Sequence, residues 1–181
     1  MRTFVAIEIS DQEILDNIAQ FQKNINIDAK AISPEQMHFT LQFIGEVDER
    51  LEEKIIIALN MIEFSKFQIT IEGVGAFPKA KSPRVIWVGV DKTGGYLLSN
   101  IANQIHKKLL ELGFKNDKPF KPHVTIFRVK NKINDITDEL KKFNSKIFGV
   151  QQVSQIKLKK STLTPSGPIY EDLAMVEARN E

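Results

Sequence analysis

The chain has 181 residues, of which 42% are hydrophobic and 27% are charged, and its formal net charge is +2. This length and composition indicate a globular protein of one domain or two small lobes, and the absence of cysteine excludes disulfides, thiolate metal sites and a cysteine nucleophile. No stretch reaches the ~20 apolar residues of a membrane span, and the first apolar run is too short for a signal peptide, so we expect a cytoplasmic protein.

The spacing of apolar residues predicts strands and amphipathic helices along the whole chain. The expected elements, in chain order, are a strand at 4–9, a helix at 14–25, strands at 37–44 and 67–74 around a helix at 51–62, a strand at 84–90, a helix at 97–112, a strand at 123–129, a helix at 133–143, and strands at 155–163 and 169–178.

Polar residues and one glycine mark where the helices begin and end. Ser10 and Glu13 have the form of a capping box for the first helix. Asp48 is expected to cap the second helix and Thr93 the third. Gly113 follows the third helix, where a left-handed residue would end it.

Both halves of the chain contain a strand, a helix, a histidine-bearing strand and another helix, which indicates an approximate internal duplication. We therefore predict an α+β fold, a single two-lobed domain over residues 1–181. Two mainly antiparallel sheets would face a central cleft, with the helices on the outer faces.

Two matching motifs carry the chemistry: His38-Phe39-Thr40-Leu41 and His123-Val124-Thr125-Ile126, which lie 123 − 38 = 85 positions apart. They use two of the three histidines of the chain. In a strand, residues two positions apart share a face, so each motif would present an imidazole beside a hydroxyl. Two such strands facing each other would form a site suited to in-line displacement at a phosphate.

Other interpretations of these residues are weaker. One histidine of this kind would be an ordinary polar residue on a strand, but the repeated motif favours function. A metal site lacks the three or four ligands that metals need, and His106 is expected to lie on the surface. The two threonines are either ordinary strand residues or donors to a phosphate.

Arg128 and Phe43 each follow a motif histidine by five positions. A guanidinium can bind a phosphate through two hydrogen bonds. Strict alternation, however, places both residues on the opposite face from the histidines, so they would need a bulge or a strand end to reach the site. Two basic loops are either solvated or form a rim for a phosphate backbone; they contain Lys79, Lys81 and Arg84, and Lys115, Lys118 and Lys121.

The motifs resemble those of the two-histidine phosphoesterase superfamily, and within it the RNA 2′,3′-cyclic phosphodiesterases, also called 2′-5′ RNA ligases. The resemblance covers nearly the whole chain. It rests on Arg2-x-Phe4-Val5-Ala6-Ile7, His38 to Gly45, Gly75-Ala76-Phe77-Pro78, Pro83 to Trp87, Pro122 to Arg128, and Gly167-Pro168-x-Tyr170.

This resemblance implies hydrolysis of a 2′,3′-cyclic phosphate at an RNA end to a 2′-phosphomonoester, with no cofactor or metal. His38 would be the proton donor and His123 the proton acceptor. Thr40, Thr125, Arg128 and Phe43 would bind the substrate. The same site run in reverse would form a 2′-5′ linkage, and we expect a monomer that acts on RNA ends.

Two alternatives remain at this point. The same site could act on 2′-5′ oligoadenylate or on ADP-ribose cyclic phosphate. The cleft could also belong to a non-catalytic module that binds RNA or a nucleotide, although binding alone does not require two imidazoles that exchange protons.

Overall fold

The computed structural model describes residues 1–180. Its helices are α1 (Gln12–Asn24), α2 (Glu49–Leu59), α3 (Lys92–Leu110) and the short α4 (Thr137–Lys141), with a 3-10 turn η1 (Pro34–Gln36). Its strands are β1 (Arg2–Glu8), β2 (Lys30–Ala31), β3 (His38–Glu46), β4 (Phe67–Phe77), β5 (Val85–Val90), β6 (Val124–Arg128), β7 (Ile147–Val153), β8 (Gln155–Thr164) and β9 (Gly167–Glu177).

The strands form one curved sheet in the order β7-β4-β5-β6-β3-β1-β8-β9, and β2 pairs with β6 beside this path. Every pairing of these strands is antiparallel. The two halves of the sheet meet between β3 and β6, where the register has one pair, Phe39 with Val124. The predicted α+β fold is therefore confirmed, and the two predicted sheets are halves of one sheet that is continuous through this pair.

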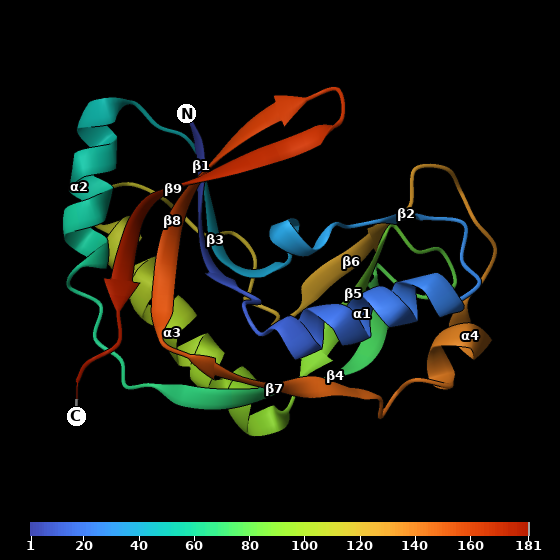
Figure 1. The fold of residues 1–181 in the computed structure, drawn as a ribbon. Coiled ribbons are helices and arrows are strands. Elements are labelled where there is room, and N and C mark those ends of the chain that lie inside the picture. The colour runs from blue at the N-terminus through green and yellow to red at the C-terminus, as the bar shows by residue number, and fades with distance from the viewer. Residues whose placement is uncertain (181) are drawn as a thin grey trace.

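The strand order also contains the predicted duplication. A helix connects two neighbouring antiparallel strands in each half: α1 lies between β1 and β3 in the chain, and α3 lies between β5 and β6. Helix α1 packs on β7, whereas α3 packs on β3 and β4 and contacts α2. Figure 1 shows α2 with α3 on one side of the molecule and α1 with α4 on the other. No helix within residues 1–180 is long and apolar enough to cross a membrane.

Strand β1 lies in the interior of the sheet between β3 and β8, and its sequence reflects this position. Its residues Phe4, Val5, Ala6 and Ile7 are all buried. A continuous apolar run of this kind, without alternation, is typical of a strand that is covered on both faces. The apolar run therefore predicted the strand, and the structure extends it from Arg2 to Glu8.

Two of the predicted helix caps are wrong by one or two positions. Asp11, and not Ser10, caps α1 by accepting the Ile14 N–H at 3.0 Å. Asp91, and not Thr93, caps α3. Tertiary contacts decide the second case, because Asp91 accepts both the Gly94 N–H at 3.0 Å and the Thr70 N–H of β4 at 2.9 Å. The cap at Asp48 is confirmed.

Strand β7 was not predicted, because Gly149 and two glutamines interrupt its apolar pattern. Gln151 is buried in spite of its polarity. Its amide accepts the N–H groups of Ser10 and Asp11 at 2.9 and 3.2 Å and donates to the Glu8 carbonyl at 2.8 Å. These long-range hydrogen bonds satisfy the amide and explain its burial. Helix α4 is also shorter than predicted, whereas Gly113 has the expected positive φ of 91°.

The cap of α3 can be tested by a pair of substitutions. We expect Asp91→Ala to lower the free energy of unfolding by about 1–2 kcal/mol, because it removes two hydrogen bonds to backbone N–H groups. Thr93→Ala, at an exposed position two residues later, should change it by less than ~0.5 kcal/mol. Urea unfolding of both variants makes the comparison, and a larger loss for Thr93→Ala would contradict the assignment.

Candidate active site

One cavity of about 610 Å³ brings together the six residues that were expected to catalyse the reaction or bind the substrate: His38, Thr40, Phe43, His123, Thr125 and Arg128. The lining comes from both halves of the sheet and from the β8–β9 hairpin. The other lining residues are Arg2, Phe4, Lys30, Ala31, Ile32, Ser33, Gln36, Ser161, Leu163, Ser166, Gly167, Pro168 and Tyr170. The two histidine strands therefore meet at one site, as the motifs predicted.

A bulge at the last residue of each motif turns the residue five positions after the histidine toward the site. In β3 the register with β1 passes from Thr40 to Gln42 and leaves Leu41 without a partner. In β6 the register with β5 passes from Thr125 to Phe127 and leaves Ile126 without a partner. An extra residue reverses the alternation of the side chains that follow it.

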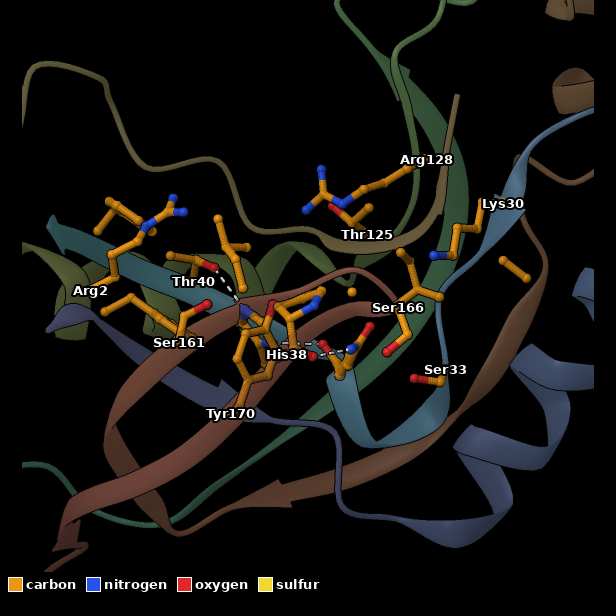
Figure 2. Close-up of a pocket in the computed structure, with 18 of the residues that line it drawn as sticks. Arg2, Lys30, Ser33, His38, Thr40, Thr125, Arg128, Ser161, Ser166 and Tyr170 are labelled. Atoms are coloured by element: carbon orange, nitrogen blue, oxygen red, sulfur yellow. Dashed lines mark hydrogen bonds between the residues drawn. The ribbon is translucent and has the colours of Figure 1, made fainter. Parts of the chain in front are cut away.

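The bulges answer the question of how Phe43 and Arg128 reach the site. Leu41 and Ile126 are buried, whereas Arg128 is exposed and the Phe43 side chain is 52% exposed. Figure 2 shows Arg128 beside Thr125, pointing into the pocket. Both residues thus share a face with the histidines, which simple alternation would forbid.

The two imidazoles are held in the same way. The Nδ1 of each ring lies within hydrogen-bonding distance of the backbone carbonyl two residues earlier: 2.8 Å from Gln36 for His38, and 2.6 Å from Lys121 for His123. A carbonyl only accepts, so Nδ1 carries the proton and Nε2 is left as the atom that exchanges protons. The Thr40 hydroxyl donates to Nε2 of His38 at 3.0 Å (Figure 2).

Aromatic rings surround both histidines and lower their basicity. The His38 ring lies 5.0 Å from the Phe4 ring and 5.5 Å from the Tyr170 ring, and the His123 ring lies 4.8 Å from the Phe77 ring. Burial lowers the pKa of His38 to about 4, and burial also lowers the pKa of His123 below 6.5. Both imidazoles are therefore neutral near pH 7 in the free protein.

A cluster of four charged residues lies behind His38. Lys157 contacts Glu8 at 3.1 Å and Asp172 at 2.8 Å, and the buried Lys159 contacts the same two carboxylates. Burial raises the pKa of Glu8 and Asp172, but hydrogen bonds from the two lysines outweigh it and hold both pKa values below their ordinary values. Lys159 is the buried member of this cluster, so loss of its carboxylate partners would leave a buried charge uncompensated, which is costly.

Glu8 connects this cluster to the histidine, because it lies opposite His38 in the register of β1 with β3. The positive charge of Lys159 lowers the pKa of His38, and the negative charge of Glu8 opposes it. Gln36 fixes the other side of the ring. Its carbonyl accepts from His38, and its side chain donates to the Pro168 carbonyl of the β8–β9 hairpin at 2.7 Å.

Several features of the site could not be read from the pattern of residues. Lys30, Ser33 and Ser166 lie in segments that the sequence analysis did not assign to a helix or a strand. His106 was expected on the surface, but it is half-buried and its Nε2 donates to the carbonyl of the bulge residue Leu41 at 3.0 Å. None of the six basic loop residues lines the cavity, although Lys121 lies over the Phe77 ring beside His123.

No group of metal-ligating side chains gathers within residues 1–180.

The low pKa of His38 predicts how the free energy of unfolding depends on pH. Between pH 6.5 and about 4, the unfolded chain binds a proton at this position that the folded protein does not bind. The free energy of unfolding should therefore fall as the pH is lowered through this window. His38→Gln should flatten this part of the curve of unfolding free energy against pH. NMR titration should give a pKa of about 4 for the His38 ring. A pH dependence that is unchanged in the variant would contradict the assignment.

Comparison with known proteins gives the family. The model of the AKAP7 2′5′ RNA ligase-like domain matches residues 2–177. A protein of Archaeoglobus fulgidus, named RNA 2′,3′-cyclic phosphodiesterase, is 43% identical over 98% of this chain and 100% of its own length. A protein of the same name from Methanocaldococcus jannaschii is 40% identical over 94% of this chain and 97% of its own length.

Solved structures show the same fold. The structure of TT0787 from Thermus thermophilus superimposes with a TM-score of 0.80 at 27% identity, covering 98% of this chain and 97% of that one. Escherichia coli LigT complexed with 3′-AMP superimposes with a TM-score of 0.81 at 22% identity, covering 99% and 98%. The chain therefore belongs to the 2′-5′ RNA ligase-like family of RNA 2′,3′-cyclic phosphodiesterases, within the two-histidine phosphoesterases.

Proposed function

We propose that the protein hydrolyses 2′,3′-cyclic phosphates at RNA ends to 2′-phosphomonoesters, with His38 as proton donor and His123 as proton acceptor. One observation carries the proposal. Two imidazoles, each held at Nδ1 by a backbone carbonyl and each followed two positions later by a threonine, line one cavity. The curated relatives that carry the name of this activity support the reaction.

The reaction is a displacement at phosphorus with two proton transfers. The neutral Nε2 of His123 removes a proton from water, and the water oxygen forms a bond to phosphorus. The bond between phosphorus and the 3′-oxygen breaks, and protonated Nε2 of His38 gives its proton to that oxygen. The products are a 2′-phosphate and a 3′-hydroxyl, and exchange with solvent restores both imidazoles. Imidazole suits both roles because its ordinary pKa is near neutrality.

The remaining polar residues of the cavity fit a phosphate that gains negative charge in the transition state. Thr40 and Thr125 supply hydroxyl donors, and the Arg128 guanidinium can form two parallel hydrogen bonds with phosphate oxygens. No Asp or Glu is among the lining residues of this cavity. Donors that are already in position need no rearrangement as charge develops, which is the main source of such stabilisation.

Phe43 provides an exposed ring at the same site. Its ring has the Arg2 guanidinium 5.6 Å from its centroid. Aromatic faces bind nucleobases by stacking without regard to sequence. We therefore assign Phe43 to the binding of the terminal base, which fits an enzyme that recognises an RNA end and not a particular sequence.

The protonation of His38 depends on the substrate. With a pKa of about 4, only about one molecule in 10³ carries the proton at pH 7 in the free protein. A cyclic phosphate carries one negative charge, and an anion beside the ring raises the pKa of the imidazole. When Nε2 is protonated, it no longer accepts from Thr40, whose hydroxyl is then free to donate to the phosphate. Substrate binding thus prepares the proton donor.

The same site run in reverse would join RNA ends. In ligation a 5′-hydroxyl takes the place of water and its oxygen forms a bond to the phosphorus of the cyclic phosphate. The bond between phosphorus and the 3′-oxygen breaks, that oxygen is protonated, and the product is a 2′-5′ linkage. The strained ring supplies the driving force, so no nucleotide cofactor is required. The cavity is complete within one chain, which supports a monomer, and an RNA substrate supports a cytoplasmic location.

The catalytic assignment predicts large losses from single substitutions. In the presence of EDTA, an oligonucleotide with a 2′,3′-cyclic phosphate end should be converted to a 2′-phosphate, as followed by chromatography. His38→Ala and His123→Ala should each lower kcat by roughly 10²–10⁴-fold. His106→Gln is the matched control, because its amide can still donate to the Leu41 carbonyl, and it should retain most of the activity.

The alternatives give different results in this assay. Binding of the oligonucleotide without turnover by the unsubstituted protein would indicate a non-catalytic RNA-binding module. Faster turnover of 2′-5′ oligoadenylate or ADP-ribose cyclic phosphate would assign one of those substrates to the same site. Loss of activity in EDTA would overturn a mechanism in which two imidazoles suffice.

The low pKa values of the histidines predict the pH dependence. Turnover needs one protonated and one neutral imidazole, so the rate should fall on both sides of an optimum. Because both pKa values lie below 6.5 in the free protein, both limbs of the kcat/KM profile should lie below about pH 6.5. The bound phosphate raises these values, so the profile of kcat should be displaced to higher pH. An alkaline limb of kcat/KM above pH 7 would contradict this account.

A further inference from the structure

At one end of the cavity, two cations face each other without an acidic neighbour. Lys30 of β2 and Arg128 of β6 are directly opposite in the antiparallel register, so their side chains leave the sheet on the same face. Within residues 1–180, neither forms an ion pair. Like charges at directly opposite positions destabilise a strand pair. The pairing therefore costs stability unless an anion binds between the two cations.

The chain holds this unfavourable pair in place with several hydrogen bonds. Strand β2 has two residues and lies beside the main path of the sheet. The residue that follows it, Ile32, donates its N–H to the Ile126 carbonyl at 2.9 Å. Gln22 of α1 donates its side-chain amide to that same carbonyl at 2.8 Å and to the Ile32 carbonyl at 3.0 Å.

The anchor of β2 is thus the bulge that also orients Arg128. Ile126 is the residue of β6 that has no partner in β5, and its carbonyl accepts two of these three hydrogen bonds, one from the Ile32 N–H and one from the Gln22 amide. One local irregularity therefore positions two cations. A lysine that was only a solvated residue of a surface loop would not require these hydrogen bonds.

Hydroxyl groups complete this end of the cavity. Ser33 and Ser166 are lining residues, and Figure 2 shows them with Lys30 at the end of the pocket opposite Arg2 and Ser161. An ammonium, a guanidinium and two hydroxyls, without a carboxylate among the lining residues, can all donate hydrogen bonds. Such a set of donors fits an anion with several oxygens, which is the chemistry of a phosphodiester.

We propose that Lys30, with Ser33, Ser166 and the shared Arg128, forms a second anion subsite for the backbone phosphate next to the cyclic end of the RNA. The inference rests on the proposed function, in which the cyclic phosphate lies at the histidines. Successive phosphates of a strand follow within a few ångströms of one another along its axis. A strand whose last phosphate is at the histidines must therefore place the preceding one near an end of the cavity. The substrate class is a polynucleotide end, in preference to a mononucleotide cyclic phosphate.

The first test compares two substrates with and without Lys30. A dinucleotide that ends in a 2′,3′-cyclic phosphate should have a kcat/KM at least ~10-fold above that of the mononucleotide, in line with one charge-assisted hydrogen bond. Lys30→Ala should remove this advantage and leave turnover of the mononucleotide unchanged. Lys54→Ala, an exposed lysine of α2 outside the cavity, is the matched control and should behave as the unsubstituted protein.

A binding experiment separates this inference from the proposed function, because it does not require turnover. The probe is a dinucleotide 2′-phosphate made with either its natural linkage or an uncharged methylphosphonate linkage. Calorimetry should show binding at least ~10-fold tighter for the natural linkage, and Lys30→Ala should abolish the difference. Equal affinities for the two probes would overturn the second subsite even if the enzyme is active. A difference that depends on Lys30 would support it even if no cyclic phosphate is hydrolysed.

Discussion

The site depends on the way in which β3 and β6 meet. The register of these strands has one pair, Phe39 with Val124, and both side chains are fully buried. This pair joins the two halves of the sheet and sets the two histidines against one cavity. Each strand then bulges three residues after its histidine, at Leu41 and Ile126. Without the bulges, the alternation of a regular strand would point Phe43 and Arg128 away from the cavity.

The polar groups of the site are organised by what they can donate or accept. Backbone carbonyls fix both Nδ1 atoms, which leaves Nε2 of each ring for the proton transfers of the proposed reaction. Burial among aromatic neighbours keeps the imidazoles neutral, whereas the charged side chains of the cavity wall, Arg2, Lys30 and Arg128, are all cations. Burial is the main cause of the low pKa of His38, and the positive charges of Lys159 and Arg128 add to it. These positive charges also favour an anion at the site. The paired charges of Glu8 and Lys159 lie behind the ring and not in the cavity, which leaves the cavity free of carboxylates.

Much of the site was predictable because its chemistry is local in the sequence. An imidazole and a hydroxyl two positions apart share a face of any strand, and finding this arrangement twice indicated a joint function. The strand at β1 and the cap at Asp48 follow equally from nearby residues. The caps of α1 and α3 were misplaced because several residues near each helix start could serve. Asp91 serves because it also binds Thr70 of β4, a contact that lies 91 − 70 = 21 positions away.

The sequence by itself determined the two motifs, the α+β class and the family, since all three rest on short patterns and their order. Only the tertiary structure decided which further residues reach the site. The bulges depend on cross-strand register. The placement of Lys30 depends on Ile32, the residue after the two-residue strand, which donates its N–H to the Ile126 carbonyl and accepts from the Gln22 amide. The contact of His106 with Leu41 likewise joins a helix to a strand 106 − 41 = 65 positions earlier. Such contacts are set by packing between distant segments, which no local pattern of residue types records.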